Sequence, residues 1–210
     1  MQKTELTGTL YIVSAPSGTG KTSLVNALVR DTNHLKLSIS HTTRPPRPKE
    51  IDGYNYHFID TAKFKQMQMA GVFMESAEVF GNFYGTSQEA VQKMLDEGHD
   101  VVLEIDWQGA EQIKARFPEA ISIFILPPSI SALKERLNGR GQDAEDIINH
   151  RMDKAISELQ HHHKADFIVV NDDFEEALKS LKAIVKSNRM TTEKQKIINQ
   201  RLINQLLIER

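Results

Sequence analysis

Short runs of apolar residues recur along the chain at intervals that suit a sheet of parallel strands. Residues 10–13, 101–105, 121–126 and 167–170 form four such runs, and residues 35–40 form a weaker fifth. Each run is followed by a loop or by apolar residues at helical spacing, which is the order of βαβ units. The pattern predicts an α/β fold in which buried parallel strands carry helices on both faces. The ligand site of such a sheet lies beyond the carboxyl ends of its strands.

Residues 41–99 interrupt this order and predict a smaller insertion with short strands. The stretch 43–48, Thr-Arg-Pro-Pro-Arg-Pro, is too rich in proline to form a helix. Residues 54–59 and 73–80 have the composition of strands. Ser87 is placed to cap a helix over residues 88–97, which Gly98 would end.

The remaining segments predict a lid and C-terminal helices. Residues 136–141, Arg-Leu-Asn-Gly-Arg-Gly, indicate a mobile basic loop, and the apolar spacing that follows indicates a long helix. Residues 174–185 and 194–207 predict two further helices. The predicted parts are a core (1–40, 100–130 and 165–210), an insertion (41–99) and a lid with its long helix (131–164).

The last predicted helix carries an apolar face whose partner the sequence leaves open. The residues of this face are Ile198, Leu202, Ile203 and Leu206. They could pack on the protein's own core or on a second subunit, so a homo-oligomer is one of two expectations.

Composition and charge narrow the class of protein. The 210 residues suffice for one α/β domain, and 40% hydrophobic with 26% charged residues is ordinary for a globular protein. The absence of cysteine excludes disulfides, thiolate catalysis and cysteine-based metal sites. No run has the length of a membrane span and the first residues lack a signal-peptide core, so we expect a cytoplasmic protein with no membrane partner. The net charge of −2 gives no reason to expect a nucleic-acid partner.

A phosphate-binding loop is the clearest motif in the chain. Its residues are Ala15, Pro16, Ser17, Gly18, Thr19, Gly20, Lys21 and Thr22. Such a loop turns backbone N–H groups toward an anion, Lys21 and the helix N-terminus add positive charge, and the Thr22 hydroxyl can bind Mg²⁺. Ala15 replaces the usual glycine, which is a mild change if that position needs no positive φ. The alternative is a glycine-rich turn with a surface lysine.

Four more residues have side chains that suit a charged ligand. Arg44 and Arg47 flank the proline-rich stretch, and Tyr56 follows it. Two forked guanidinium groups on a stiff loop suit a phosphate monoester, and a tyrosine hydroxyl adds a donor. The alternative is a solvated basic loop. Asp106 follows a predicted strand, where it could contact a ligand, cap the next helix, or do both.

Two conspicuous features are better explained without ligand binding. His161, His162 and His163 are adjacent, so on a helix their side chains point in different directions, and no cysteine completes a metal site. They are interpreted as the polar end of the predicted long helix. Trp107 is interpreted as a packing residue beside Asp106.

Four motifs, in this order along the chain, resemble guanylate kinases of the bacterial type. They are Ser-His-Thr-Thr-Arg-Pro-Pro-Arg at 40–47, Gly-Asn-Phe-Tyr-Gly-Thr at 81–86, Ile-Asp-Trp-Gln-Gly at 105–109 and Arg-Leu-Asn-Gly-Arg-Gly at 136–141. The resemblance extends from about residue 8 to residue 190. It implies a core, a monophosphate-binding part and a lid, and transfer of the γ-phosphoryl group of ATP to GMP with Mg²⁺.

The resemblance also implies roles for residues of a GMP site. The residues that match holders of the GMP phosphate are Ser40, Arg44, Arg47, Tyr56 and, beside them, Tyr84. The residues that match readers of guanine are Glu75 and Thr86, and Asp106 matches an acid of the same site. A carboxylate accepts from both N1–H and N2–H of guanine, whereas adenine has an acceptor at N1 and no 2-amino group. Without the resemblance, Glu75 would be interpreted as a surface carboxylate.

On the ATP side, the resemblance covers the phosphate loop, the lid and one strand end. Residues 15–22 and Arg136 match the holders of ATP, and Asn171 matches a contact to its adenine. The implied catalytic residues are Lys21, Arg44, Arg140 and Arg151, because positive charge stabilises the transferring phosphoryl group. Glu104 stands where many relatives carry aspartate, which leaves its role open.

Three rival functions are distinguished by particular residues. A kinase that prefers dGMP or AMP is the nearest rival, and Glu75 and Thr86 argue against AMP. A non-catalytic binding module is disfavoured because Lys21, Thr22 and the lid arginines are all retained. A P-loop GTPase is disfavoured because the chain has no Asn-Lys-x-Asp motif.

Overall fold

A five-stranded parallel sheet forms the centre of the structure, which is a computed structural model that describes residues 7–138 and 145–208. Its strands are β1 (Leu10–Ser14), β2 (Leu35–Leu37), β7 (Asp100–Glu104), β8 (Ile121–Leu126) and β9 (Phe167–Val170). They lie in the order β2-β7-β1-β8-β9, and every neighbouring pair is parallel. The predicted parallel sheet is therefore confirmed, although β2 is shorter than the run that predicted it.

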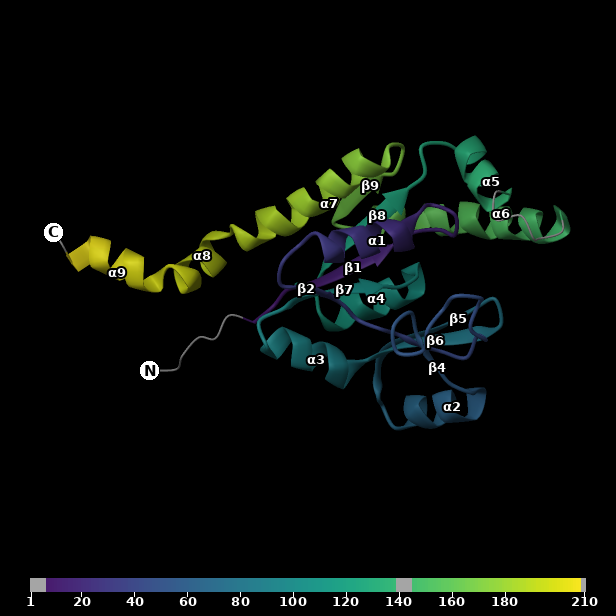
Figure 1. The fold of residues 1–210 in the computed structure, drawn as a ribbon, viewed down its shortest axis with the longest axis horizontal. Coiled ribbons are helices and arrows are strands. Elements are labelled where there is room, and N and C mark those ends of the chain that lie inside the picture. The colour runs from purple at the N-terminus through teal and green to yellow at the C-terminus, as the bar shows by residue number, and fades with distance from the viewer. Residues whose placement is uncertain (1–6, 139–144, 209–210) are drawn as a thin grey trace.

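Helices cover both faces of this sheet (Figure 1). They are α1 (Lys21–Arg30) and α7 (Phe174–Arg189) on one face, and α3 (Gln88–Asp96) and α4 (Trp107–Arg116) on the other. The central strand β1 supplies both cores, because Tyr11 and Val13 belong to the first and Leu10 and Ile12 to the second. A strand buried on both faces reads as a continuous apolar run, which is why the sequence revealed it.

The strand β9 corrects one expectation, because it was predicted to be buried. It lies at one edge of the sheet, opposite β2. Phe167, Ile168 and Val170 are 44%, 49% and 51% exposed, and only Val169 belongs to the core. An edge strand has a neighbour on one side only, so an apolar run by itself does not establish burial.

The segment 41–99 carries a second, mixed sheet in the order β4-β3-β6-β5. Its strands are β3 (His41–Thr42), β4 (His57–Phe58), β5 (Phe73–Val79) and β6 (Asn82–Ser87), and α2 (Thr61–Met69) joins β4 to β5. Only β3 and β4 pair in parallel. The hydrophobic pattern did not predict α2 or β6, because α2 buries only Phe64 and β6 contains Asn82 and Gly85.

Two packed helices, α5 (Ile130–Asn138) and α6 (Glu145–Leu159), lie at one end of the molecule (Figure 1). A 3-10 turn, η1 (Gln160–Lys164), follows α6. The expectation of a loop over 136–141 is wrong at residues 136–138, which end α5. Leu133 and Leu137 of α5 pack against Met152 and Ala155 of α6, and this contact extends the helix. The rest of that expected loop lies outside the described residues.

The C-terminal segment leaves the body of the molecule as two helices rather than one (Figure 1). They are α8 (Thr192–Ile198) and α9 (Gln200–Ile208). Ile198, Leu202 and Leu206 are 55%, 53% and 61% exposed, so packing of these three on the protein's own core is wrong. The homo-oligomer stays a prediction. Within the described residues, each helix is too short or too polar to cross a membrane.

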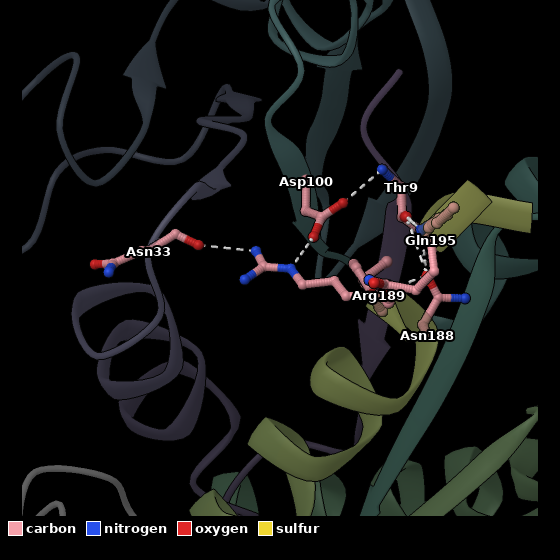
Figure 2. A network of polar contacts seen from close by, with 8 residues as sticks. Thr9, Asn33, Asp100, Asn188, Arg189 and Gln195 are labelled. Atoms are coloured by element: carbon pink, nitrogen blue, oxygen red, sulfur yellow. Dashed lines mark hydrogen bonds and ion pairs between the residues drawn. The ribbon is translucent and has the colours of Figure 1, made fainter. Parts of the chain in front are cut away.

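A polar network fastens the C-terminal helices to the amino-terminal edge of the main sheet (Figure 2). The buried Asp100 carboxylate accepts hydrogen bonds from the Thr9 backbone N–H and from Arg189 Nε, each at 2.7 Å. Lys194 donates to Thr9 Oγ1 and to Asn188 Oδ1, and burial lowers the pKa of its ammonium group. This network leaves the opposite, carboxyl edge of the sheet available for a ligand site.

Candidate functional site

The phosphate loop joins β1 to α1 and has the backbone that its glycines predict. Gly18 and Gly20 have φ values of 90° and 89°, in the left-handed region that favours glycine. A Cβ on Gly20 would lie 2.6 Å from Nδ2 of Asn171, so close packing also requires glycine there. Ala15 is not among the described residues with positive φ, so its methyl group adds no backbone strain.

The first two residues of α1 reach the carboxyl end of β7. Lys21 Nζ donates to the Ile105 carbonyl at 2.9 Å, and Thr22 Oγ1 donates to Glu104 Oε1 at 2.5 Å. Hydroxyl and carboxylate oxygens are the ligands that Mg²⁺ prefers in proteins. The Thr22–Glu104 pair therefore fits a magnesium ion bound together with nucleotide phosphates, and it gives Glu104 a contact that the sequence did not define.

Side chains from the lid helices and from the end of β9 also contact the phosphate loop. Asn171, which is 5% exposed, donates from Nδ2 to the Thr19 carbonyl at 2.6 Å. Arg136 Nη2 donates to the Asn171 carbonyl at 2.9 Å, and Arg151 Nη2 donates to Ser17 Oγ at 3.0 Å. The structure thus brings these three predicted residues together at the loop. Arg140 lies outside the described residues.

Three buried polar side chains form a chain of contacts beside the second sheet. Thr86 Oγ1 donates to Glu75 Oε1 at 2.6 Å and lies 3.2 Å from Ser40 Oγ. Antiparallel pairing of β5 with β6 sets Glu75 opposite Thr86. Burial raises the pKa of Glu75 to about 7, against the opposing effect of the Thr86 hydrogen bond. A carboxylate held in such a place accepts strong hydrogen bonds from any donor that a ligand brings.

Asp106 begins α4 and lies near the same cluster. Its Oδ1 accepts from the Gly109 backbone N–H at 2.9 Å, so the predicted helix cap is confirmed. The charge of Asp106 also favours the protonated form of Glu75 and contributes to its raised pKa. A Cβ on Gly109 would lie 2.5 Å from Glu75 Oε2, so glycine allows α4 to approach this carboxylate.

Two of the residues expected to hold a phosphate, Tyr56 and Tyr84, lie beside the partly buried guanidinium group of Arg44. Arg44 Nη2 pairs with Glu50 Oε1 at 2.8 Å, and the Arg44 guanidinium carbon lies 5.6 Å from the Tyr56 ring centroid. The Tyr56 and Tyr84 rings meet edge to face, with centroids 5.9 Å apart. Burial raises the pKa of Tyr56 to about 12, so its hydroxyl remains a proton donor at neutral pH. Arg47 is exposed, and its backbone N–H donates to Glu50 Oε2 at 2.7 Å.

Trp107 has the packing role that the sequence indicated, and the three histidines lie in η1, directly after the end of α6. Trp107 stacks on His161 with ring centroids 3.6 Å apart and planes inclined by 15°. His161 Nδ1 lies 3.2 Å from Glu111 Oε1. The Nδ1 atoms of His162 and His163 each lie 2.7 Å from a backbone carbonyl in the preceding turn. The three rings thus have three different sets of partners.

Three residues that lie near this site were not predicted from the sequence, namely Glu50, Gly109 and Glu158. Glu158 on α6 is buried, and burial raises the pKa of its carboxyl group against the opposing charges of Lys154 and Lys21. The sequence spacing could have predicted that Glu158 lies near the site. Glu158 lies seven residues, or two helical turns, beyond Arg151 and therefore shares its face of the helix. No comparable signal existed for Gly109, whose contact with Glu75 depends on how α4 packs against β5.

Two clusters of polar residues therefore meet at the carboxyl ends of the central strands. The phosphate loop contacts Glu104 and Ile105 at the end of β7. The pKa of Tyr56 in the insertion is raised mainly by burial, and the negative charge of Glu104 is the second cause. A phosphate loop that shares a sheet edge with a second polar pocket defines the class of P-loop α/β nucleotide-binding proteins.

Comparison with known proteins narrows this class to one family. The family model for guanylate kinase matches residues 7–188. A guanylate kinase of Pseudomonas fluorescens (strain Pf0-1) is 54% identical over 204 residues, which are 97% of this chain and 99% of that protein. A guanylate kinase of Alkalilimnicola ehrlichii is 55% identical over 200 residues, with 95% and 98% covered. The crystal structure of guanylate kinase from Anaplasma phagocytophilum has a TM-score of 0.77 at 30% identity and covers 94% of this chain and 97% of its own. The chain belongs to the guanylate kinase family, as its motifs predicted.

Proposed function

We propose that the protein transfers the γ-phosphoryl group of ATP to GMP, giving ADP and GDP, in the cytoplasm. The observation that carries this proposal is the buried Glu75–Thr86 pair, because a carboxylate there can accept from both N1–H and N2–H of guanine. A buried site of this kind rejects adenine by leaving its own polar groups unpaired, at about 1–3 kcal/mol for each group. Membership in the guanylate kinase family supports the same substrate.

In this proposal GMP lies between the insertion and the edge of the main sheet. Glu75 accepts from the base, and Thr86 turns its hydroxyl from Glu75 toward O6. Asp106 lies beside the base through its proximity to Glu75. The residues proposed to hold the GMP phosphate are Ser40, Arg44, Arg47, Tyr56 and Tyr84. Glu50 keeps Arg44 oriented, since the two form an ion pair in which both side chains are mostly buried.

ATP is proposed to bind at the phosphate loop. The backbone N–H groups of residues 15–22 and Lys21 hold its phosphates, and Arg136 and Asn171 close the loop from the side of α5 and β9. Thr22, with Glu104 within hydrogen-bond distance, would hold Mg²⁺. When bound, this ion neutralises part of the phosphate charge.

Catalysis is proposed to rest on the placement of positive charge. A GMP phosphate oxygen forms the new bond to the γ-phosphorus as the bond to the ADP oxygen breaks. Lys21, Arg44 and Arg151 surround this region, and Arg140, outside the described residues, is expected to join them. Approach of the insertion and the lid excludes water, which would otherwise accept the phosphoryl group.

A substrate panel tests the proposal. We expect ADP formation from ATP and Mg²⁺ with GMP, and with AMP a kcat/KM at least about a hundredfold lower. dGMP and IMP complete the panel. Lys21→Ala is expected to abolish ADP formation while the melting temperature stays near that of the wild type. Equal use of AMP would contradict the guanine pocket, and GMP binding without any ADP formation would indicate a non-catalytic binding module.

A further inference from the structure

The helix α4 presents one face to the strand β5 of the insertion. Gly109, Gln112 and Arg116 are three and four residues apart, so they lie along the same side of this helix. The helix begins at its cap Asp106, shortly after β7 of the main sheet, whereas β5 belongs to the second sheet. The contact between α4 and β5 therefore joins the core of the protein to the strand that carries Glu75.

Two side chains of α4 form hydrogen bonds with the backbone of β5 on either side of Glu75. Gln112 Oε1 accepts from the Ser76 backbone N–H at 3.1 Å, and Gln112 Nε2 donates to the Ser76 carbonyl at 2.9 Å. Arg116 Nη1 donates to the Met74 carbonyl at 2.8 Å. β5 is an edge strand of its sheet, and the outward N–H and C=O groups of such a strand have no neighbouring strand to bond with. The side chains of α4 thus take the place that a further strand would occupy.

The position of the Glu75 carboxylate depends on this backbone. The carboxylate accepts from Thr86 of β6 at one oxygen, and Gly109 allows α4 to approach the other oxygen. The pairing of β5 with β6 is irregular between Phe73 and Glu75, and such an irregularity locally disrupts the hydrogen-bonded ladder. The ladder alone therefore holds β5 less firmly just before the carboxylate, and α4 contacts the backbone immediately before and after it.

We propose that Gln112 and Arg116 are positioning residues for the recognition of guanine. They hold the backbone on both sides of Glu75, so that its carboxylate faces N1–H and N2–H of the base together. They act through the β5 backbone rather than on the base. Because α4 starts from the main sheet, the same hydrogen bonds keep the base pocket aligned with the sheet edge at which ATP is proposed to bind. This inference rests on the proposed function, since it concerns the GMP half of that site.

Substitutions on α4 test the inference through base choice. Gln112→Ala and Arg116→Ala remove the hydrogen bonds to β5, and Arg116→Lys keeps one donor. The matched control is Gln92→Ala, which removes the hydrogen bond that an exposed glutamine of α3 makes within its own helix. The readout is the preference for GMP over IMP, measured as the ratio of their Kd values by calorimetric titration and as the ratio of their kcat/KM values.

We expect each alanine variant to lower the preference for GMP over IMP by about three- to tenfold, which is the range for loss of one hydrogen bond. The reason is that a displaced Glu75 carboxylate loses its bond to the 2-amino group, which GMP has and IMP lacks. The Kd of ADP should stay within about twofold, because ADP binds at a separate site. Arg116→Lys should lie between Arg116→Ala and the wild type, and Gln92→Ala should match the wild type.

A double-variant comparison separates positioning of Glu75 from a general effect on stability. The amide of Glu75→Gln cannot accept from both guanine donors, so adding Gln112→Ala to it should change the preference for GMP by less than about twofold. An equal change in the wild-type and Glu75→Gln backgrounds would overturn the inference, and so would a lower melting temperature with an unchanged preference. If the alanine variants do not fold, the fall in preference is required of Arg116→Lys at a smaller size, and its absence overturns the inference. The Kd values are measured without catalysis, so a wild-type protein that prefers GMP to IMP but forms no ADP would contradict the proposed function alone.

Discussion

Glu75 is a carboxylate with 4% exposure that accepts a hydrogen bond from the Thr86 hydroxyl. Its pKa is raised from 4.5 to about 7, chiefly by burial, so the folded state binds this proton more tightly than the unfolded state does. Protonated Glu75 therefore contributes to the free energy of unfolding. This contribution is fully present below pH 4.5 and is lost as the pH rises through 7, and the loss amounts to roughly 3 kcal/mol. We therefore expect Glu75→Gln to have a higher free energy of unfolding than the wild type at pH 8 and a similar one at pH 4.5. Urea unfolding at both pH values measures this, and a Glu75→Gln protein less stable at pH 8 would contradict it.

The same substitution should change base choice. The amide of Glu75→Gln keeps one acceptor oxygen but turns its NH₂ group toward one of the two guanine donors. We expect kcat/KM for GMP to fall, by an amount that corresponds to about 2–4 kcal/mol of transition-state stabilisation. We expect kcat/KM for IMP to fall less, because IMP lacks the 2-amino group. The GMP-to-IMP ratio of kcat/KM measures the effect. Equal losses for both substrates would mean that Glu75 does not contact the 2-amino group, and no loss for either would remove Glu75 from the guanine pocket.

At the scale of residues, the sequence predicted contacts that are local and left open those that are not. The phosphate loop is eight consecutive residues, so its motif was visible directly. Glu75 and Ser40 lie 11 and 46 residues from Thr86, and only the family resemblance placed them in one pocket. Glu158 was missed because an acid on a helix is usually solvated, and its burial follows from the docking of α6 on the loop.

At the scale of elements, apolar runs were reliable guides to the position of strands. β8 and β9 have the predicted bounds, although β8 is mostly buried and β9 mostly exposed. The helix α2 was not predicted, because its tertiary contacts depend on one buried phenylalanine. The predicted C-terminal helix is interrupted at Asn199, where no core contact favours a continuous helix.

The network of Figure 2 gives a prediction at this scale, because it joins β1, β7 and α7 through Asp100. Asp100→Ala leaves the Thr9 backbone N–H and the partly exposed Arg189 without their shared carboxylate, and loss of the partner of a buried polar group costs about 1–3 kcal/mol for each group. The control is Glu97→Ala, which removes a surface pair with Lys36 and should cost at most about 1 kcal/mol. Urea unfolding compares the two variants. Equal effects would mean that the network adds no more stability than a surface ion pair.

At the scale of the whole molecule, the amino ends and the carboxyl ends of the strands in the main sheet have different roles. The amino edge holds the network that fixes the C-terminal helices, and the carboxyl edge carries the phosphate loop and Asp106. The insertion and α6 both project toward the carboxyl edge. The sequence predicted that the carboxyl edge carries the phosphate loop and Asp106, and it did not predict the network at the amino edge. The contact between the insertion and α6 involves a lysine and an aromatic residue that no motif contains.

The contact between Lys154 of α6 and Phe80 of the insertion predicts how these two parts of the protein move. Phe80, at the turn between β5 and β6, has 47% exposure, and Lys154 of α6 lies over its ring. A cation–π contact at an exposed site is worth about 0.5–1 kcal/mol, which is too little to hold two parts of a protein together continuously. GMP is proposed to bind the insertion and ATP to bind beside α6. The two parts of the protein should therefore be held close together only when both ligands are bound. We expect backbone amides of the β5–β6 turn and of α6 to exchange hydrogen more slowly with GMP and a non-hydrolysable ATP analogue than with either alone, while β8 exchanges at one rate throughout. Hydrogen exchange by mass spectrometry measures this, and equal rates in the free and the doubly bound protein would show that these parts do not close on their ligands.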